Sequence, residues 1–98
     1  MSDAIVVRYE TTVDAAAENQ RLVERVYAEL AEARPSGIRY LTLRLADGVT
    51  FVHVALRDGD DNPLARVRAF AEFQAGLADR VVGPPQPNDA TIVGSYGF

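Results

Sequence analysis

The sequence predicts an α+β domain in the order β-α-β-β-α-β, with a four-stranded antiparallel sheet and two helices on one face. Two observations carry this prediction. Residues 37–56 alternate in side-chain type on both sides of Asp47-Gly48, as the strands of a hairpin do. Residues 14–34 and 63–80 instead place apolar side chains at three- and four-residue steps, which is typical of amphipathic helices.

The first strand is expected over residues 4–10, where β-branched and aromatic side chains predominate. Successive side chains of a strand point to opposite faces. One face would hold Ile5, Val7 and Tyr9, and the other would hold Val6, Arg8 and Glu10.

The first helix is expected over residues 14–34. Its apolar stripe consists of Leu22, Val23, Val26, Tyr27, Leu30 and Ala33. Asp14 suits the positive end of the helix dipole, and Pro35-Ser36-Gly37 ends the helix.

The hairpin follows over residues 37–56. Asp and Gly both tolerate a positive φ, so Asp47-Gly48 favours a tight turn, and that turn sets Thr42 opposite His53. One face is then aliphatic, with Leu41, Leu43, Leu45, Val52, Val54 and Leu56. The other face is mixed, with Ile38, Tyr40, Thr42, Arg44, Phe51, His53 and Ala55. We expect the aliphatic face to pack under the helices and the mixed face to lie against a second copy of the chain, because a monomer would expose a large apolar patch.

The second helix is expected over residues 63–80, with Asn62 as its N-cap and Pro63 at the first helical position. Gly76 costs about 1 kcal/mol relative to alanine inside a helix, so it marks close packing or an early end. Residues 81–89 hold three prolines and are expected to form an extended connector. Residues 90–98 are expected to form the last strand.

Composition limits the function classes. The 98 residues have room for one core, so we expect a single domain over residues 1–98. The net charge of −4 argues against a nucleic-acid or anionic membrane partner, and no segment is apolar enough to span a membrane. The chain has no cysteine and no recognisable signal peptide, so we expect a cytoplasmic protein.

No metal or cofactor is predicted. The acidic loop that begins at Asp58 fails as a calcium loop, because Ala69 stands at the twelfth position, where such a loop needs glutamate. One histidine without cysteine argues against a zinc or iron site built from one chain. Haem held by His53 is a less favoured alternative.

The element order, the two-faced hairpin, the Pro-rich connector and the closing segment Val93-Gly94-Ser95-Tyr96-Gly97-Phe98 resemble the dimeric α/β barrel superfamily. It includes the antibiotic-biosynthesis-monooxygenase-like and stress-responsive barrel families, and residues 62–74 are similar to small actinobacterial members. The resemblance implies ferredoxin-like subunits whose sheets pair into one barrel, as a homodimer with small-molecule pockets. Members include cofactor-independent oxygenases, isomerases and haem-binding proteins. This chain lacks the tryptophan that oxygenase members often place near the substrate.

His53 is the candidate catalytic residue, because an imidazole on a mixed face can move a proton near neutral pH. The alternative is a buried histidine whose nitrogens are satisfied by Thr42 or a main-chain carbonyl. The candidate ligand-binding residues are Arg8, Tyr40, Thr42, Phe51 and Tyr96. Arg8 or a tyrosine would hold an oxyanion, and Phe51 would stack on an aromatic ring.

Each of these residues also has a structural alternative. Arg8 could pair with Glu10 at a solvated strand end, and the opposite facing of the first strand would place Tyr9 at the pocket instead. The tyrosines could pack in the core or the interface. Two functions therefore stay open: a cofactor-independent monooxygenase- or isomerase-like protein for a small aromatic metabolite, or a non-catalytic accessory or stress-associated dimer.

Overall fold

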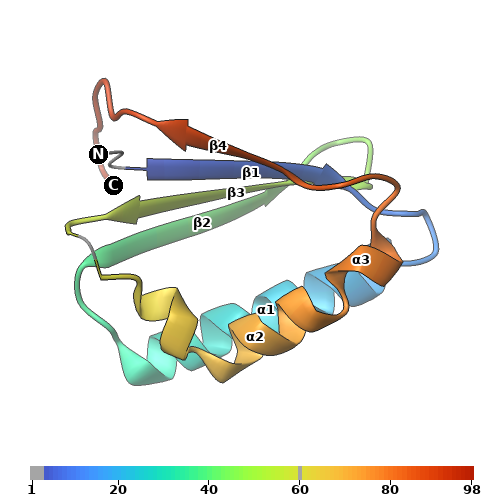
Figure 1. Ribbon diagram of the computed structural model, residues 1–98, viewed down its shortest axis with the longest axis horizontal. Helices are drawn as coiled ribbons and strands as arrows, with labels where there is room; N and C mark the ends of the chain where they lie inside the picture. The colour runs from blue at the N-terminus through green and yellow to red at the C-terminus, as the bar shows by residue number, and fades with distance from the viewer. Residues whose placement is uncertain (1–3, 60) are drawn as a thin grey trace.

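The computed structural model describes residues 4–59 and 61–98. Its elements in chain order are β1 (Ala4–Glu10), α1 (Ala16–Ala33), β2 (Ile38–Arg44), β3 (Thr50–Arg57), the 3-10 helix η1 (Pro63–Arg66), α2 (Arg68–Ala75), α3 (Leu77–Arg80) and β4 (Gln86–Ala90). The four strands form one antiparallel sheet in the order β2-β3-β1-β4, and the helices lie on one side of it (Figure 1). The predicted α+β fold with a ferredoxin-like arrangement is confirmed.

The hairpin has the predicted register, with Thr42 opposite His53 and Leu43 opposite Val52. Asp47 shapes the turn, because its Oδ1 accepts hydrogen bonds from the backbone nitrogens of Val49 and Thr50 at 2.9 and 2.8 Å. The φ of Gly48 is 80°, a conformation that glycine adopts without strain.

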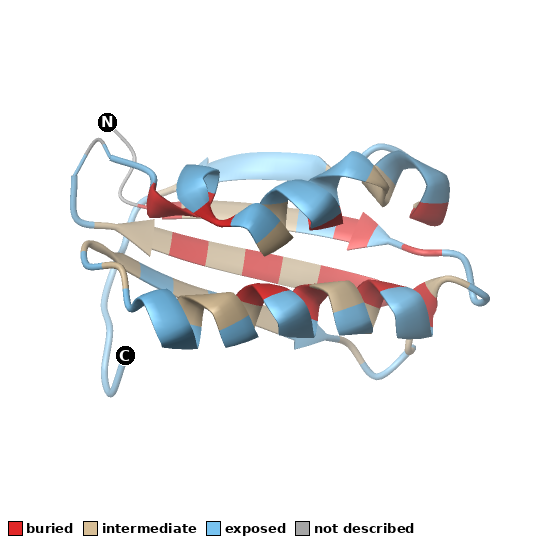
Figure 2. Cartoon of the chain, turned by 90° about the horizontal axis from the view of Figure 1, so that it is seen from below, coloured by how far each residue is buried: buried red, intermediate tan, exposed pale blue. Residues whose placement is uncertain are grey.

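The prediction of which sheet face lies under the helices was wrong. Phe51 and His53 of the mixed face are 1% and 6% exposed, whereas Leu41 and Leu43 of the aliphatic face are 37% and 44% exposed. Figure 2 shows the resulting alternation of buried and partly buried positions along β3. A period of two shows which residues share a face, but it does not show which face is covered. The aliphatic side is therefore the open side of the sheet.

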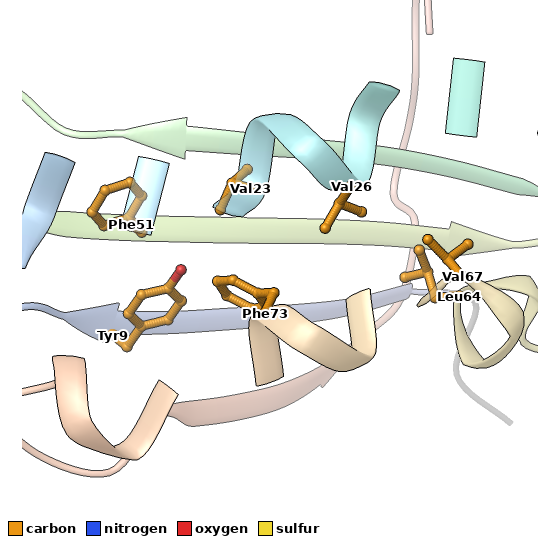
Figure 3. Close-up of a cluster of buried hydrophobic side chains, with 7 residues drawn as sticks. All are labelled: Tyr9, Val23, Val26, Phe51, Leu64, Val67 and Phe73. Carbon is orange, nitrogen blue, oxygen red and sulfur yellow. The ribbon is translucent and has the colours of Figure 1, made fainter. Parts of the chain in front are cut away.

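Aromatic rings determine which face of the sheet packs against the helices, because they fill the space between the sheet and the helices. Tyr9 stacks on Phe51 with ring centroids 5.7 Å apart, and its ring lies 6.3 Å from that of Phe73 on α2 (Figure 3). The buried cluster consists of Tyr9, Val23, Val26, Phe51, Leu64, Val67 and Phe73.

The region predicted as one helix over 63–80 is three short segments. Asn62 does cap the first of them, since its Oδ1 accepts from the Leu64 nitrogen at 3.2 Å. Val67 then adopts an extended conformation, and Gly76 separates α2 from α3. A Cβ on Gly76 would lie 2.8 Å from a guanidinium nitrogen of Arg80, so this glycine makes room for a buried arginine.

The last strand was predicted in the wrong place. β4 covers Gln86–Ala90, within the Pro-rich segment, and residues 91–98 contain no strand. Pro87 is tolerated because β4 is an edge strand, where a missing N–H faces away from the ladder. Val93 and Tyr96 in the closing segment are fully exposed. None of the described helices is long and apolar enough to cross a membrane.

Candidate functional site

A cavity of about 440 Å³ lies between the helix-covered side of the sheet and the helices α2 and α3. Its volume is within the range of small-molecule sites, about 300–1,000 Å³. Most of its wall is apolar and comes from Ile5, Val7, Ala55, Leu64, Phe70, Phe73, Leu77, Pro85 and Pro87. The polar lining residues are Tyr9, Tyr40, His53, Arg57, Asn62 and Gln74.

His53 lies in the cavity wall with both ring nitrogens engaged by hydroxyl groups. The Tyr9 hydroxyl is 2.7 Å from Nε2, and the Tyr40 hydroxyl is hydrogen-bonded to Nδ1. Thr42 Oγ1 is 3.2 Å from the same Nδ1, and it also bonds the Tyr27 hydroxyl at 2.7 Å. The imidazole is therefore held between two phenols. It has no free nitrogen for haem iron in this arrangement.

Behind Tyr9 the hydrogen bonds continue to two residues that the sequence analysis missed. Asn19 Nδ2 donates to the Tyr9 hydroxyl at 2.9 Å, and Arg80 Nε donates to Asn19 Oδ1 at 3.0 Å. Arg80 also donates through Nη2 to the carbonyl oxygen of Phe73 at 2.7 Å. Asn19 is 0% exposed and Arg80 is 6% exposed. Among the described residues, no carboxylate forms an ion pair with Arg80.

Burial sets the protonation states of this cluster. Desolvation lowers the pKa of His53 to about 4, so the imidazole is neutral at pH 7. Desolvation raises the pKa of Tyr9 to about 12, although the hydrogen bond from Asn19 and the charge of Arg80 oppose the shift. Desolvation likewise raises the pKa of Tyr40. The chain of hydrogen bonds therefore carries a single charge at pH 7, on Arg80.

The structure brings three of the predicted site residues together, namely His53, Tyr40 and Thr42. Only His53 and Tyr40 of these line the cavity, and Thr42 lies behind them, outside its wall. The other three predicted residues also lie outside the wall. Arg8 is exposed on the open side of the sheet, because the pairing of β1 with β3 sets Val7 opposite His53. Phe51 is buried in the core against Tyr9, and Tyr96 is fully exposed. Tyr9 takes the place expected for Arg8, as the alternative facing of the first strand had allowed.

Arg57 is the second polar feature of the cavity. Its Nε is buried and has no hydrogen-bond partner in the described part of the chain. His53 and Arg57 are four positions apart on β3 and share the helix-covered face, so their Cα atoms are about 13 Å apart along the strand. Arg57 nevertheless lines the cavity, so its guanidinium places a positive charge at that end of it.

Over residues 4–59 and 61–98, no group of three His, Cys, Asp or Glu side chains could hold a metal ion.

No protein-family model and no curated protein matches this sequence. Solved structures do match it. The "putative antibiotic biosynthesis monooxygenase" of Nitrosomonas europaea has a TM-score of 0.77 and 14% identity over 99% of this chain and 97% of that one. The NE2512 protein of unknown function from the same organism has a TM-score of 0.75 and 19% identity over 95% and 90%. SnoaB, a cofactor-independent oxygenase from Streptomyces nogalater, has a TM-score of 0.61 and 22% identity over 92% and 93%. The chain therefore has the fold of the antibiotic-biosynthesis-monooxygenase-like proteins.

Proposed function

We propose that the protein binds a small aromatic metabolite in this cavity and acts on it as a cofactor-independent monooxygenase- or isomerase-like protein. The observation that carries the proposal is the mostly apolar cavity of about 440 Å³ with a neutral imidazole between two tyrosine hydroxyls in its wall. The likeness to SnoaB supports the oxygenase class. The non-catalytic dimer is the second candidate, and it is favoured by the full satisfaction of both nitrogens of His53.

Both reaction classes share one step, in which a water molecule that enters with the ligand takes a proton from an activated C–H bond and negative charge collects on a neighbouring oxygen. The Tyr40 hydroxyl would bind that oxygen, and His53 behind it would pass a proton along the hydrogen bond. In an isomerisation the proton returns to another carbon. In a monooxygenation the carbanion reacts with dioxygen, so that a CH₂ group becomes C=O and the second oxygen atom leaves as water.

Replacing Tyr40 with phenylalanine should lower kcat about 100-fold, the usual effect of losing one donor to a developing oxyanion. Anthrone is a suitable probe because its oxidation to anthraquinone consumes one dioxygen molecule, which an oxygen electrode records. The control is Tyr96→Phe, which removes the same hydroxyl from a fully exposed position and should change nothing. If the wild-type protein neither consumes oxygen with anthrone nor binds it, the non-catalytic function is favoured.

We propose that the ligand carries an acidic group at the end of the cavity that Arg57 lines, because a guanidinium pairs well with a carboxylate. Calorimetry should show tighter binding of 2-naphthoate than of the neutral 2-naphthamide. The Arg57→Met variant should lose that preference, a loss of about 10-fold in affinity for the acid. Arg8→Met removes an exposed arginine from the open side of the sheet and should keep the preference. Equal binding of both compounds to the wild-type protein would refute an acidic ligand.

We further propose that two copies pair through the open face of the sheet to form the α/β barrel. This face presents the aliphatic residues Val6, Leu41, Leu43, Val52, Val54 and Leu56. These side chains form an apolar centre with Arg8 and Arg39 beside it, and pairing with a second copy across a two-fold axis would remove the exposed leucines from water. In this arrangement each subunit keeps its own cavity. The lack of cysteine is consistent with the cytoplasmic location that we propose.

A further inference from the structure

The hydrogen bonds in the cavity wall form one continuous chain that begins at a group able only to donate. The chain runs from Arg80 through Asn19, Tyr9 and His53 to Tyr40. A guanidinium has N–H donors and no acceptor. Its position at one end therefore restricts the direction of every bond that follows.

Because Arg80 donates, Asn19 must turn its Oδ1 toward the guanidinium, which leaves its Nδ2 to donate to the oxygen of Tyr9. The Tyr9 O–H is then free to donate to Nε2 of His53. A neutral imidazole carries one N–H, so the hydrogen is on Nδ1, where it is donated to the oxygen of Tyr40.

We infer that Arg80 and Asn19 hold His53 in its Nδ1–H tautomer, which leaves the hydroxyl hydrogen of Tyr40 free to donate to a ligand oxygen in the cavity. Arg80 and Asn19 are positioning residues, since neither lines the cavity. The ligand must then present an acceptor, such as a ketone, quinone or phenolate oxygen, next to Tyr40. The ligand part of this inference rests on the proposed function, whereas the tautomer is a property of the free protein.

The opposite direction is less favourable because it leaves a buried hydrogen without an acceptor. If Nε2 carried the hydrogen, the Tyr9 oxygen would accept from both His53 and Asn19. Its own O–H would then have no acceptor in the described part of the chain, although the Tyr9 side chain is only 4% exposed. In the Nδ1–H tautomer the spare hydrogen is instead that of Tyr40, which is half-buried and lines the cavity, where water can accept it. An unsatisfied buried donor disfavours the Nε2–H tautomer by a factor on the order of 10 to 100.

Nitrogen-15 NMR can test the tautomer directly, because the chain contains a single histidine and its imidazole has only two nitrogen signals. At pH 7 the ligand-free wild-type protein should show Nδ1 protonated and Nε2 bare, as judged from the coupling of each nitrogen to the ring hydrogens. A protonated Nε2, or an averaged mixture of the two tautomers, would overturn the inference.

Replacing Asn19 with aspartate should reverse the chain. A carboxylate accepts from Arg80 and also from the Tyr9 O–H, so the Tyr9 oxygen would accept from Nε2–H of His53 and Nδ1 would become bare. In this variant the spectrum should show Nε2 of His53 protonated and Nδ1 bare. Gln20→Glu places the same chemical change on the next residue of α1, outside the chain, and should leave the wild-type tautomer in place. An unchanged tautomer in a folded Asn19→Asp protein would overturn the inference, and the wild-type spectrum tests it even if this variant does not fold.

A pair of ligands tests the role of Tyr40. 1-Tetralone and tetralin share a skeleton, but only the ketone has an oxygen that can accept from Tyr40. The wild-type protein should bind the ketone about 10-fold more tightly, and Asn19→Asp should abolish that preference. If Asn19→Asp still prefers the ketone, the inferred hydrogen bond from Tyr40 to the ligand oxygen is refuted. If neither compound binds, the proposed function fails while the tautomer result stands.

Discussion

Lowering the pH from 6.5 to about 4 should reduce the free energy of unfolding by about 3 kcal/mol through His53 alone. In the unfolded chain a histidine takes up a proton near pH 6.5, whereas burial lowers the pKa of the folded His53 to about 4. Between these values the unfolded state binds one more proton than the folded state, so acid favours unfolding. Below the folded pKa both states are protonated, and His53 adds no further loss.

Urea unfolding of the wild-type protein and of His53→Gln across this pH range measures the effect. Carboxylates such as Asp47 and Asp61, whose pKa values are lowered by hydrogen bonds, titrate in both proteins and cancel in the difference. The stability advantage of the wild-type protein over His53→Gln should shrink by about 3 kcal/mol as the pH falls. A difference that is independent of pH would mean that the folded protein protonates His53 at least as readily as the unfolded chain does, and the buried, uncharged imidazole of the proposed site would be refuted.

Local signals in the sequence predicted the helices and strands of this fold well, but they did not predict how these elements pack together. The turn at Asp47-Gly48 sets the hairpin register through contacts a few residues apart, and α1 follows from its own apolar stripe. The facing of the sheet depends instead on which side chains fill the gap to helices distant in sequence. Phe51 and Tyr9 stack there, and the ring of Phe73 on α2 lies against Tyr9. No pattern within β3 encodes that contact.

The candidate site was predicted in part for the same reason. His53 and Tyr40 were found because polar aromatic residues stand out in a hairpin. Asn19 carried a signal that was missed, since it lies four positions before Val23 on the buried side of α1. The burial of Arg80 was harder to predict. Its one trace in the sequence is Gly76, four residues earlier, where any side chain would clash with the guanidinium. The hydrogen bonds that connect Arg80 and Asn19 to Tyr9 are tertiary contacts, which only the structure reveals.

Replacing Leu43 with glutamate should convert the proposed dimer into monomers, with a rise in the dissociation constant of at least about 100-fold. Leu43 lies on the open side of the sheet and is 44% exposed in the single chain. Two-fold symmetry introduces the charge twice, and each carboxylate would lose its water among aliphatic side chains. Sedimentation equilibrium measures the change. Val13→Glu alters an apolar residue that is 81% exposed just before α1, and it should leave the association unchanged. Identical monomeric behaviour of the wild-type protein and both variants would refute the dimer.

The same variant separates association from ligand binding. If His53 faced a second copy, as the hairpin pattern predicts, a monomer would have no pocket. The structure instead places the cavity between the sheet and the helices α2 and α3, on the side of the sheet opposite Leu43. A monomeric Leu43→Glu protein should therefore bind 1-tetralone within about 3-fold of the wild-type affinity, because ordinary surface changes alter stability by only about 0.5 kcal/mol. If binding disappears together with the dimer, the partner subunit must complete the site, and the cavity of one chain is not the ligand site.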